Sequence, residues 1–350
     1  MTLIFQLGDR KMDCAAVPPD RIMAIGHGFK AAKALLSALE LGLFTALAEE
    51  PFGAEALRRR LGLHARGARD FFDALVAVGL LERDESGRYS NTREAALYLD
   101  RNQPTYIGGE LEFVNARQFG PWANLTAALR KGKPQSGARA QTNYGAYYSD
   151  PDSLENVIRG MTGGSVLAAR ALGQKFPWRD YRTIMDIGTA QGCLPVQIAM
   201  AHPHLTGGGF DLPPLKPYFE RYVGAHGLSE RLAFTPGDFF RDALPAADVI
   251  VMGRVLHNWD LATKRMLLAK AHAALPPGGA LIVYERLIDD ERRANAAALL
   301  ASLNMLIMTA GGFDFTGADC IAWMEEAGFR DLRVEPLTRE HAMVIGEKMK

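Results

Sequence analysis

Cysteine is scarce in this chain, and other features that would narrow its class are missing. Only three cysteines, Cys14, Cys193 and Cys320, occur among 350 residues. They are odd in number and widely separated, which excludes a disulfide framework or a zinc-binding pattern and favours a reducing compartment. No apolar run approaches the ~18 residues of a membrane span, and the N-terminus shows no basic start followed by an apolar signal core. The sequence therefore predicts a cytoplasmic protein.

Net charge and several sequence signatures are also lacking. Forty basic and forty acidic residues cancel, so no overall field favours nucleic acid or an anionic membrane. The chain has no G-x-S-x-G elbow of a hydrolase, no G-x-G-x-x-G loop, and no histidine and carboxylate pattern with metal-ligand spacing. Apolar residues are abundant, at 48%. The length exceeds the roughly 250–300 residues that one core usually serves, so we expect more than one domain.

The N-terminal part begins with a helical pattern. Apolar residues at spacings of three and four predict a helix over 21–48, interrupted by Gly42. Because this helix is apolar on more than one side, we expect it to be buried, with a partner chain as one candidate surface.

A winged-helix pattern follows. Two short helices over 54–61 and 63–79 precede a turn at 85–88 that would join two strands. DNA binding is the usual association of this fold, but the second helix mixes arginines with aspartates and presents no basic stripe. The pattern therefore favours a packing and dimerisation module over a DNA-binding regulator.

Helical and then alternating patterns make up the remainder. Residues 101–175 are predicted to be helical apart from a Gly/Pro/Gln-rich interruption, and their many aromatic residues could belong to a core or line a ligand cavity. Beyond them, strands alternate with helices, which predicts a doubly wound, mostly parallel α/β sheet. The predicted strands are 183–187, 206–210, 232–235, 248–252 and 280–284, with a last hydrophobic helix over 295–308.

The stretch after the first of these strands predicts a cofactor site. Asp186 ends the buried run, and the small-residue loop between Gly188 and Gly192 opens the next helix. An acid at the end of the second strand, Asp211, is placed where a ribose hydroxyl pair is usually held. Later, Asp238 and Phe239 could bond and stack an adenine. Each residue taken singly could instead cap the following helix.

His257 follows the fourth predicted strand and is the candidate general base. A histidine with an ordinary pKa near 6.5 is suited to deprotonate a substrate near neutral pH, although a lone histidine is more often a capping or core residue. Such a base needs an orienting acid, and Glu285 and Asp314 are the available carboxylates.

Six motifs together resemble a known family. In chain order they are D-I-G-T-A-Q-G from Asp186, F-D-L-P from Phe210, G-D-F-F from Gly237, R-V-L-H-N-W-D from Arg254, P-G-G from Pro277 and S-L-N-M-L from Ser302. This set resembles the S-adenosylmethionine-dependent O-methyltransferases of the plant caffeate/acetylserotonin type. The likeness covers nearly the whole chain, since that family also has an N-terminal helical and winged-helix dimerisation domain.

The resemblance implies roles for individual residues. It makes His257 the general base flanked by Glu285 and Asp314, with no metal. It implies a cofactor site for S-adenosylmethionine, the product being S-adenosylhomocysteine, and a substrate site for a small aromatic hydroxyl compound. The cofactor residues are then Asp186, Gly188, Gly192, Asp211, Leu212, Gly237, Asp238, Phe239, Arg254 and Tyr147, and the substrate residues are Asn304, Met308, Met161, Trp259 and Phe113.

The expected organisation has three parts: a helical and winged-helix dimerisation domain over 1–100, a helical connector lining the substrate pocket over 101–175, and a cofactor-binding catalytic domain over 176–350. The expected reaction is transfer of a methyl group to a phenolic hydroxyl in secondary metabolism, carried out by a homodimer. Alternatives are methyl transfer to carbon or nitrogen, a non-methylating relative of the same fold, an inactive binding paralogue, and a winged-helix regulator.

The chain departs from the family pattern in two places. Thr189 and Ala190 stand where the family has glycines, and their side chains restrict the loop backbone. Asp314 is one methylene shorter than the family's glutamate, so its reach to His257 decides whether Glu285 orients the base alone.

Overall fold

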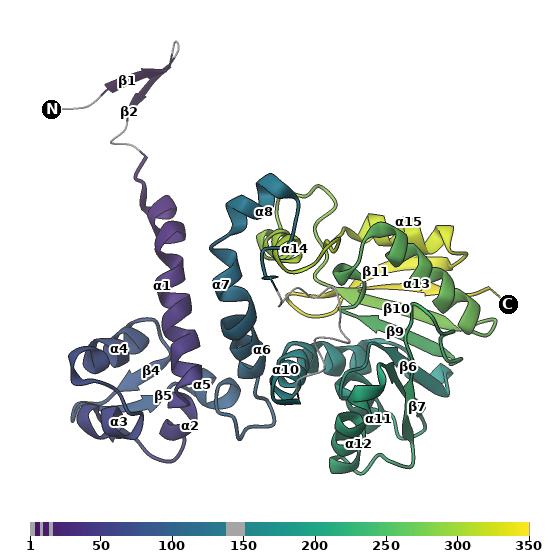
Figure 1. Ribbon diagram of the computed structural model, residues 1–350, viewed down its shortest axis with the longest axis horizontal. Coiled ribbons are helices and arrows are strands. Elements are labelled where there is room, and N and C mark those ends of the chain that lie inside the picture. Colours follow the sequence, from purple (N-terminus) through teal and green to yellow (C-terminus); the bar gives the residue numbers. More distant parts are fainter. Residues whose placement is uncertain (1–3, 8–9, 14–16, 138–150, 350) are drawn as a thin grey trace. The chain divides into compact units, whose positions relative to one another are not determined.

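The computed structural model describes residues 4–7, 10–13, 17–137 and 151–349 (Figure 1). The chain divides into two compact units, Met1–Gly108 and Gly109–Lys350. Among the described residues, no helix is both long and apolar enough to cross a membrane.

The first unit contains a small hairpin and a winged helix. The hairpin pairs β1 (Ile4–Leu7) with β2 (Arg10–Asp13). The sheet of the winged helix has the order β3-β5-β4, and β3 is a short strand that the sequence did not predict. The other elements are α1 (Asp20–Glu40), α2 (Leu43–Leu47), β3 (Phe52–Gly53), α3 (Ala54–Arg60), α4 (Ala65–Ala77), β4 (Leu81–Arg83), β5 (Arg88–Asn91) and α5 (Arg93–Tyr98).

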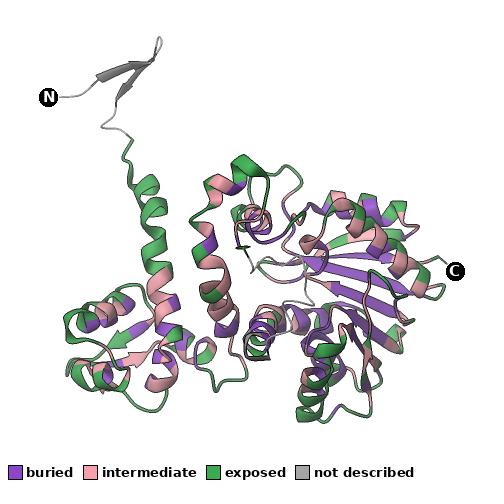
Figure 2. Ribbon diagram, viewed as in Figure 1, coloured by how far each residue is buried: buried purple, intermediate pink, exposed green. Residues whose placement is uncertain are grey.

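Within the single chain, helix α1 is buried along only part of its length, and its burial against a partner chain stays a prediction. Leu36 and Leu39 near its C-terminal end are buried, but Ile22, Ile25 and Phe29 are 74%, 72% and 59% exposed. Figure 2 shows this exposed N-terminal half. The apolar pattern thus correctly predicted a helix. The single chain covers only the C-terminal end of the apolar surface of that helix.

A seven-stranded sheet organises the second unit. Its order is β11-β12-β10-β9-β6-β7-β8, with β6 to β10 parallel and β12 antiparallel to both of its neighbours. The prediction of a doubly wound, mostly parallel sheet is confirmed. The strands are β6 (Thr183–Ile187), β7 (Thr206–Asp211), β8 (Leu232–Pro236), β9 (Val249–Gly253), β10 (Ala280–Glu285), β11 (Arg330–Pro336) and β12 (Ala342–Glu347).

Helices precede and flank this sheet. Those before it are α6 (Gly108–Phe113), the π-helical turn η1 (Val114–Gln118), α7 (Phe119–Trp122), α8 (Leu125–Lys131) and α10 (Pro151–Lys175). Those within it are α11 (Cys193–Ala201), α12 (Lys216–Ala225), α13 (Leu261–Ala274), α14 (Ala296–Met308) and α15 (Gly317–Glu326), with short 3-10 turns η3 (Trp178–Asp180), η4 (Pro213–Leu215) and η5 (Leu256–Asn258).

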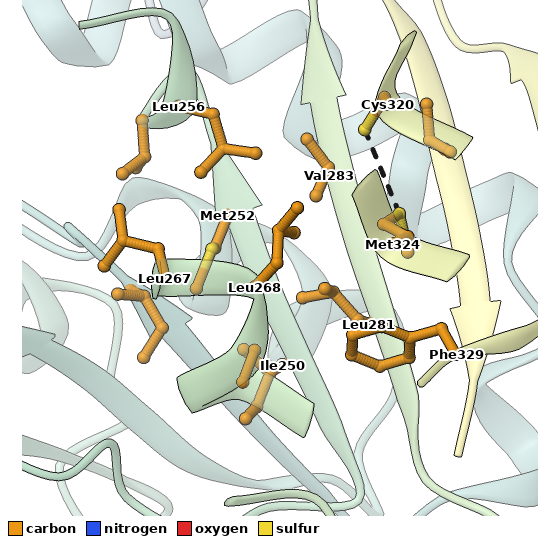
Figure 3. Packing of buried hydrophobic residues seen from close by; sticks show 14 of the residues in the cluster. Ile250, Met252, Leu256, Leu267, Leu268, Leu281, Val283, Cys320, Met324 and Phe329 are labelled. Atoms are coloured by element: carbon orange, nitrogen blue, oxygen red, sulfur yellow. Dashed lines mark hydrogen bonds between the residues drawn. The ribbon is translucent and has the colours of Figure 1, made fainter. Parts of the chain in front are cut away.

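The core on one face of the sheet supports the strand ends that carry function. Side chains of β9 and β10, such as Ile250 and Val283, pack against Leu267 and Leu268 of α13 and against Met324 of α15 (Figure 3). These residues are fully buried. Burial of each such side chain stabilises the fold by about 1.5–3 kcal/mol, which holds the carboxyl ends of β9 and β10 in a rigid frame.

Candidate active site

A cavity of about 350 Å³ opens at the carboxyl ends of β6, β7, β9 and β10. This is the edge at which open α/β sheets bind ligands, because the strand order reverses between β6 and β9. Residues from α6, η1 and α10 complete its lining. The predicted site residues that line it are Phe113, Met161, Asp186, Gly188, Asp211, Leu212, Gly237, Asp238, Phe239, Arg254, His257 and Trp259.

The structure places the other predicted site residues elsewhere. Gly192 begins α11 below the cavity, while Glu285 and Asp314 are buried behind His257. The Oδ1 atom of Asn304 accepts a hydrogen bond from the Trp122 indole at 2.9 Å. Met308 is fully buried in a cluster with α8. Neither Asn304 nor Met308 lines this cavity, and their contact with a substrate stays a prediction. Tyr147 lies outside the described residues.

The loop between β6 and α11 holds a tight, left-handed conformation. Gly188 and Gly192 have φ angles of 76° and 88°. The amide of Gly188 donates to the Phe210 carbonyl at 2.9 Å, and the amide of Gly192 donates to the Thr189 carbonyl at 2.9 Å. Ala190 also has a positive φ, 50°, which costs a residue with a Cβ roughly 1–2 kcal/mol. The loop thus keeps a conformation that favours glycine although one of its turn residues is alanine.

The side chain of Thr189 is accommodated by a glycine on the neighbouring strand. A Cβ atom at Gly209 of β7 would lie 2.2 Å from the Thr189 Cγ2 atom, a distance that real Cβ atoms do not show. The missing side chain of Gly209 therefore leaves the room that Thr189 fills. This pairing explains how the loop tolerates the first departure from the family pattern.

Two carboxylates stand at the ends of the first two strands. Burial, opposed by a hydrogen bond from Thr189 and assisted by the nearby Asp211, raises the pKa of Asp186 to about 7. Burial raises the pKa of Asp211 to about 6, although it accepts hydrogen bonds from the amides of Ala190 (2.9 Å) and Leu212 (2.8 Å). Both groups are thus poised to bind a ligand that offers positive charge or hydroxyl donors.

Aromatic rings form one wall of the cavity. The rings of Phe239 and Phe240 meet the ring of Trp259 edge-on, with centroids 5.7 and 4.8 Å apart. The carboxylate of Asp238 accepts from the Phe240 amide at 2.9 Å and so fixes this turn. A flat heterocycle could stack against such a wall, with the Asp238 turn beside it.

Arg254 is held in an unusual backbone conformation and in an ion-pair network. Its φ is 57°, and its guanidinium pairs with Glu110 of α6 at 3.3 Å. Glu110 also pairs with Arg286 at 3.2 Å. Burial opposes the ionisation of Glu110, but the two arginines outweigh it and lower its pKa. Gly164 of α10 leaves space for Arg254, since a Cβ there would lie 2.0 Å from the guanidinium. Arg254 therefore enters the cavity in a fixed position.

His257 meets both candidate acids. Its Nδ1 atom lies 3.5 Å from the Oε2 atom of Glu285 and 3.4 Å from the Oδ1 atom of Asp314. Asp314 reaches the histidine despite its shorter side chain. Burial disfavours the charged imidazole, but the two carboxylates outweigh it and raise the pKa of His257. Because Nδ1 faces the acids, Nε2 is the atom left to accept a proton from a ligand in the cavity.

The same three side chains are compact enough to surround a cation. One atom of each of His257, Glu285 and Asp314 lies within 4.8 Å of the others, although the sequence shows no metal-ligand spacing among them. The ammonium of Lys264 also interacts electrostatically with Glu285 and Asp314.

Sequence reasoning missed part of the lining. Helix α10 contributes Thr162 and Ser165 beside Met161, and the Thr162 hydroxyl bonds the Gln191 side chain at 2.6 Å. Small and polar residues on one face of an otherwise apolar helix were the available signal. Phe313 and Phe315, which lie on either side of Asp314, do not line the cavity. The lining residues that were missed are Gln118, Thr162, Ser165, Cys193, Leu194, Gly253, Val255, Asn258 and Tyr284.

Comparison with known proteins places these features in a family. Residues 122–330 match the O-methyltransferase domain, and residues 23–101 match the O-methyltransferase dimerisation domain. The tetracenomycin polyketide synthesis 8-O-methyl transferase TcmO of Streptomyces glaucescens is 40% identical over 94% of this chain and 97% of its own. The N,N-dimethyltransferase OxyT of Streptomyces rimosus is 38% identical over 90% of this chain and 91% of its own.

A solved structure shows the same fold. Human N-acetylserotonin methyltransferase, crystallised in complex with S-adenosylmethionine, superposes with a TM-score of 0.89 at 26% sequence identity. The match covers 98% of this chain and 100% of the human chain.

Proposed function

This chain belongs to the O-methyltransferase family that carries a dimerisation domain, and on that premise we propose that it methylates a phenolic hydroxyl with His257 as general base. The methyl donor is S-adenosylmethionine, and the acceptor is a small aromatic metabolite. The observation that carries the proposal is the placement of His257, which lines the cavity and is backed by two buried carboxylates.

The residues present fit S-adenosylmethionine. Gly188 forms a cradle that a side chain would fill, since a Cβ there would lie 2.9 Å from Val255. Asp186 and Asp211 offer acceptors for an ammonium and for ribose hydroxyls, and the wall of Phe239, Phe240 and Trp259 suits an adenine. When bound, S-adenosylmethionine supplies a methyl group on a sulfonium, whose sulfide leaves without acid assistance.

The remaining task of the protein is to orient the acceptor hydroxyl and to remove its proton. A phenol has a pKa near 10, so a neutral imidazole gives enough help when it is correctly placed. The Nε2 atom of His257 takes the proton, and the resulting imidazolium is stabilised at Nδ1 by Glu285 and Asp314. The enclosing apolar side chains Phe113, Met161 and Met305 keep water from the reacting oxygen.

Two observations bear on the acceptor. The relative TcmO is an 8-O-methyl transferase of polyketide synthesis, which supports a fused aromatic phenol of secondary metabolism as the substrate. The relative OxyT is an N,N-dimethyltransferase, so an amine acceptor is the second candidate. An intact base with two supporting acids favours the hydroxyl, because a neutral amine already carries the nucleophilic lone pair and needs no base before attack.

The test compares wild-type protein with His257→Ala in a labelled-methyl assay over a panel of hydroxylated and amino-substituted polycyclic aromatics. We expect the substitution to reduce kcat by about 10²–10⁴-fold, the usual contribution of a general base, and to leave S-adenosylmethionine affinity by calorimetry nearly unchanged. The exposed His226 provides the control, His226→Ala. All assays contain a chelator, and turnover is expected to persist. Full activity of His257→Ala would contradict the assignment.

The chain has three parts in this proposal. We propose that residues 1–100 form the dimerisation domain, that residues 101–175 are a helical connector contributing to the substrate pocket, and that residues 176–350 bind the cofactor. The exposed apolar face of α1 and the match to a dimerisation domain support a homodimer.

A further inference from the structure

Lys264 of α13 is a buried lysine that the proposed mechanism does not use. Its side chain is fully buried, at 0% exposure. The Nζ atom donates a hydrogen bond to the carbonyl of Trp259. It also lies 3.4 Å from the centroid of the Phe313 ring and 5.5 Å from that of Phe315. A buried ammonium is costly, so its retention here calls for a compensating role.

These contacts join the two segments that deliver the base and one of its acids. Trp259 lies two residues after His257, at the end of η5. Phe313 and Phe315 lie on either side of Asp314. One ammonium therefore ties the histidine-bearing turn to the loop that carries Asp314, through a carbonyl on one side and two aromatic faces on the other.

The buried carboxylates near His257 lie within the electrostatic reach of this ammonium. The Oε2 atom of Glu285 and both carboxylate oxygens of Asp314 are buried, and no donor among the described residues reaches them with hydrogen-bond geometry. Lys264 interacts electrostatically with both acids. The charged and titratable groups that face this cluster are His257, Glu285, Asp314, Arg254, Asp260 and Cys320.

We propose that Lys264 is a positioning residue: its ammonium holds the turn that bears His257 against the loop that bears Asp314, and its charge offsets that of the carboxylates beside the Nδ1 atom of His257. The inference rests on the proposed function, because it assumes that His257 works as the base. Burial lowers the pKa of Lys264 to about 8 while the acids oppose that fall, so the ammonium form predominates at neutral pH.

Loss of the Lys264 charge should shift the pH dependence of kcat in one direction. Removal of a positive charge from a set of coupled acids raises every apparent pKa of the set. Without Lys264, His257 would keep its proton to higher pH, and that proton must leave before His257 can act. The acidic limb of the kcat profile therefore moves to higher pH.

The test measures kcat and KM against pH for wild-type protein, Lys264→Met and Lys264→Gln. We expect both variants to shift the acidic limb upward by about one pH unit, which is roughly tenfold in kcat on that limb, with recovery toward the wild-type value at alkaline pH. KM stays nearly constant. Glutamine keeps an uncharged donor for Trp259, so a normal profile in Lys264→Gln alone would overturn the charge role.

Lys348 provides a matched control at the other end of the same helix. Its Nζ atom donates to the carbonyls of His272 and Leu275 at 2.8 and 2.7 Å. Lys348→Met removes a lysine that bonds backbone carbonyls at the C-terminal end of α13, as Lys264 bonds one just before its N-terminal end, but it leaves the acids beside His257 untouched. A pH-independent loss of kcat in the Lys264 variants, or the same upward shift in Lys348→Met, would contradict the inference.

Two NMR measurements test the inference without measuring turnover. In wild-type protein, the Lys264 side-chain signals should show an ammonium at pH 7, and a neutral amine there would overturn the proposal even if the variants fail to fold. In Lys264→Met, the ring signals of His257 should titrate at higher pH than in wild type. If the ring titration shifts but His257→Ala retains full turnover, the positioning role stands and the general-base assignment fails.

Discussion

Asp186 and Asp211 are buried carboxylates whose ionisation is costly in the folded protein. Both carboxylates are held at strand ends where burial makes ionisation costly, and the pKa of Asp186 rises to about 7. A protein that kept these groups for stability alone would replace them by neutral residues. A ligand with positive charge or hydroxyl donors would compensate for the lost solvation of the ionised groups.

The first prediction concerns Asp186→Asn in the cofactor-free protein. The folded-state pKa lies above the ordinary value, so the stabilising contribution of the protonated acid is complete below about pH 4 and is lost as the pH rises through 7. We therefore expect the variant to exceed wild type in unfolding free energy by roughly 2–4 kcal/mol at pH 8 and to match it near pH 4. Urea denaturation at both pH values measures this, with the exposed Glu230→Gln as control.

The same substitution should weaken S-adenosylmethionine binding, because it removes an acceptor from the cavity. A variant that loses affinity while gaining stability would show that Asp186 serves binding at the expense of the fold. Equal stability of variant and wild type at pH 8 would contradict the burial argument.

At the scale of elements, the β6–α11 loop depends on close approaches between backbone and side chains. Gly192 combines a φ of 88° with a position where a Cβ would lie 2.6 Å from the Phe219 ring. Phe219 of α12 is itself fully buried. Gly192 therefore satisfies two structural requirements: a left-handed backbone conformation and a close contact between α11 and α12.

At Gly227 only the backbone requirement applies. Its φ is 68°, and nothing lies within 4 Å of an added Cβ. We expect Gly227→Ala to lower the unfolding free energy by about 1 kcal/mol from backbone strain alone. Gly192→Ala should cost roughly 2–4 kcal/mol, since the Phe219 ring must also move. Chemical denaturation measures both, and equal losses would show that the ring contact carries no cost.

At the scale of the whole molecule, the exposed face of α1 is the strongest sign of assembly. Ile22, Ile25 and Phe29 leave an apolar strip in solvent on a helix within the dimerisation-domain match. Burying each of these side chains against a partner would stabilise the assembly by about 1.5–3 kcal/mol. The first unit thus has the surface that a homodimer requires.

The double substitution Ile25→Asp with Phe29→Asp should weaken a homodimer by roughly a hundredfold or more, because it places charge where apolar surface is buried. Light scattering over a range of protein concentrations measures the change. Met200→Asp, at an exposed apolar residue of α11, provides the control and should not alter assembly. A wild-type monomer at all concentrations would contradict the dimer.

Local patterns in the sequence determined the secondary structure of the sheet and the positions of its chemistry. The predicted strand over 183–187 coincides with β6, and the other strands agree within a residue or so. Since parallel strands end at one edge of a sheet, Asp186, Asp211 and His257 could be assigned to one site without coordinates. Hydrophobic periodicity and glycine spacing are properties of neighbouring residues, and a sequence displays them directly.

Only the tertiary structure decided which residues distant in the chain meet. The contact of Asp314 with His257, the pairing of Glu110 with Arg254 and the burial of Lys264 behind the base follow from packing between separate elements. The exposed half of α1 is a finding of the same kind, because its apolar pattern does not say which chain covers it. Charge balance in a buried cluster depends on distances in space, and a single sequence encodes those only through the complete fold.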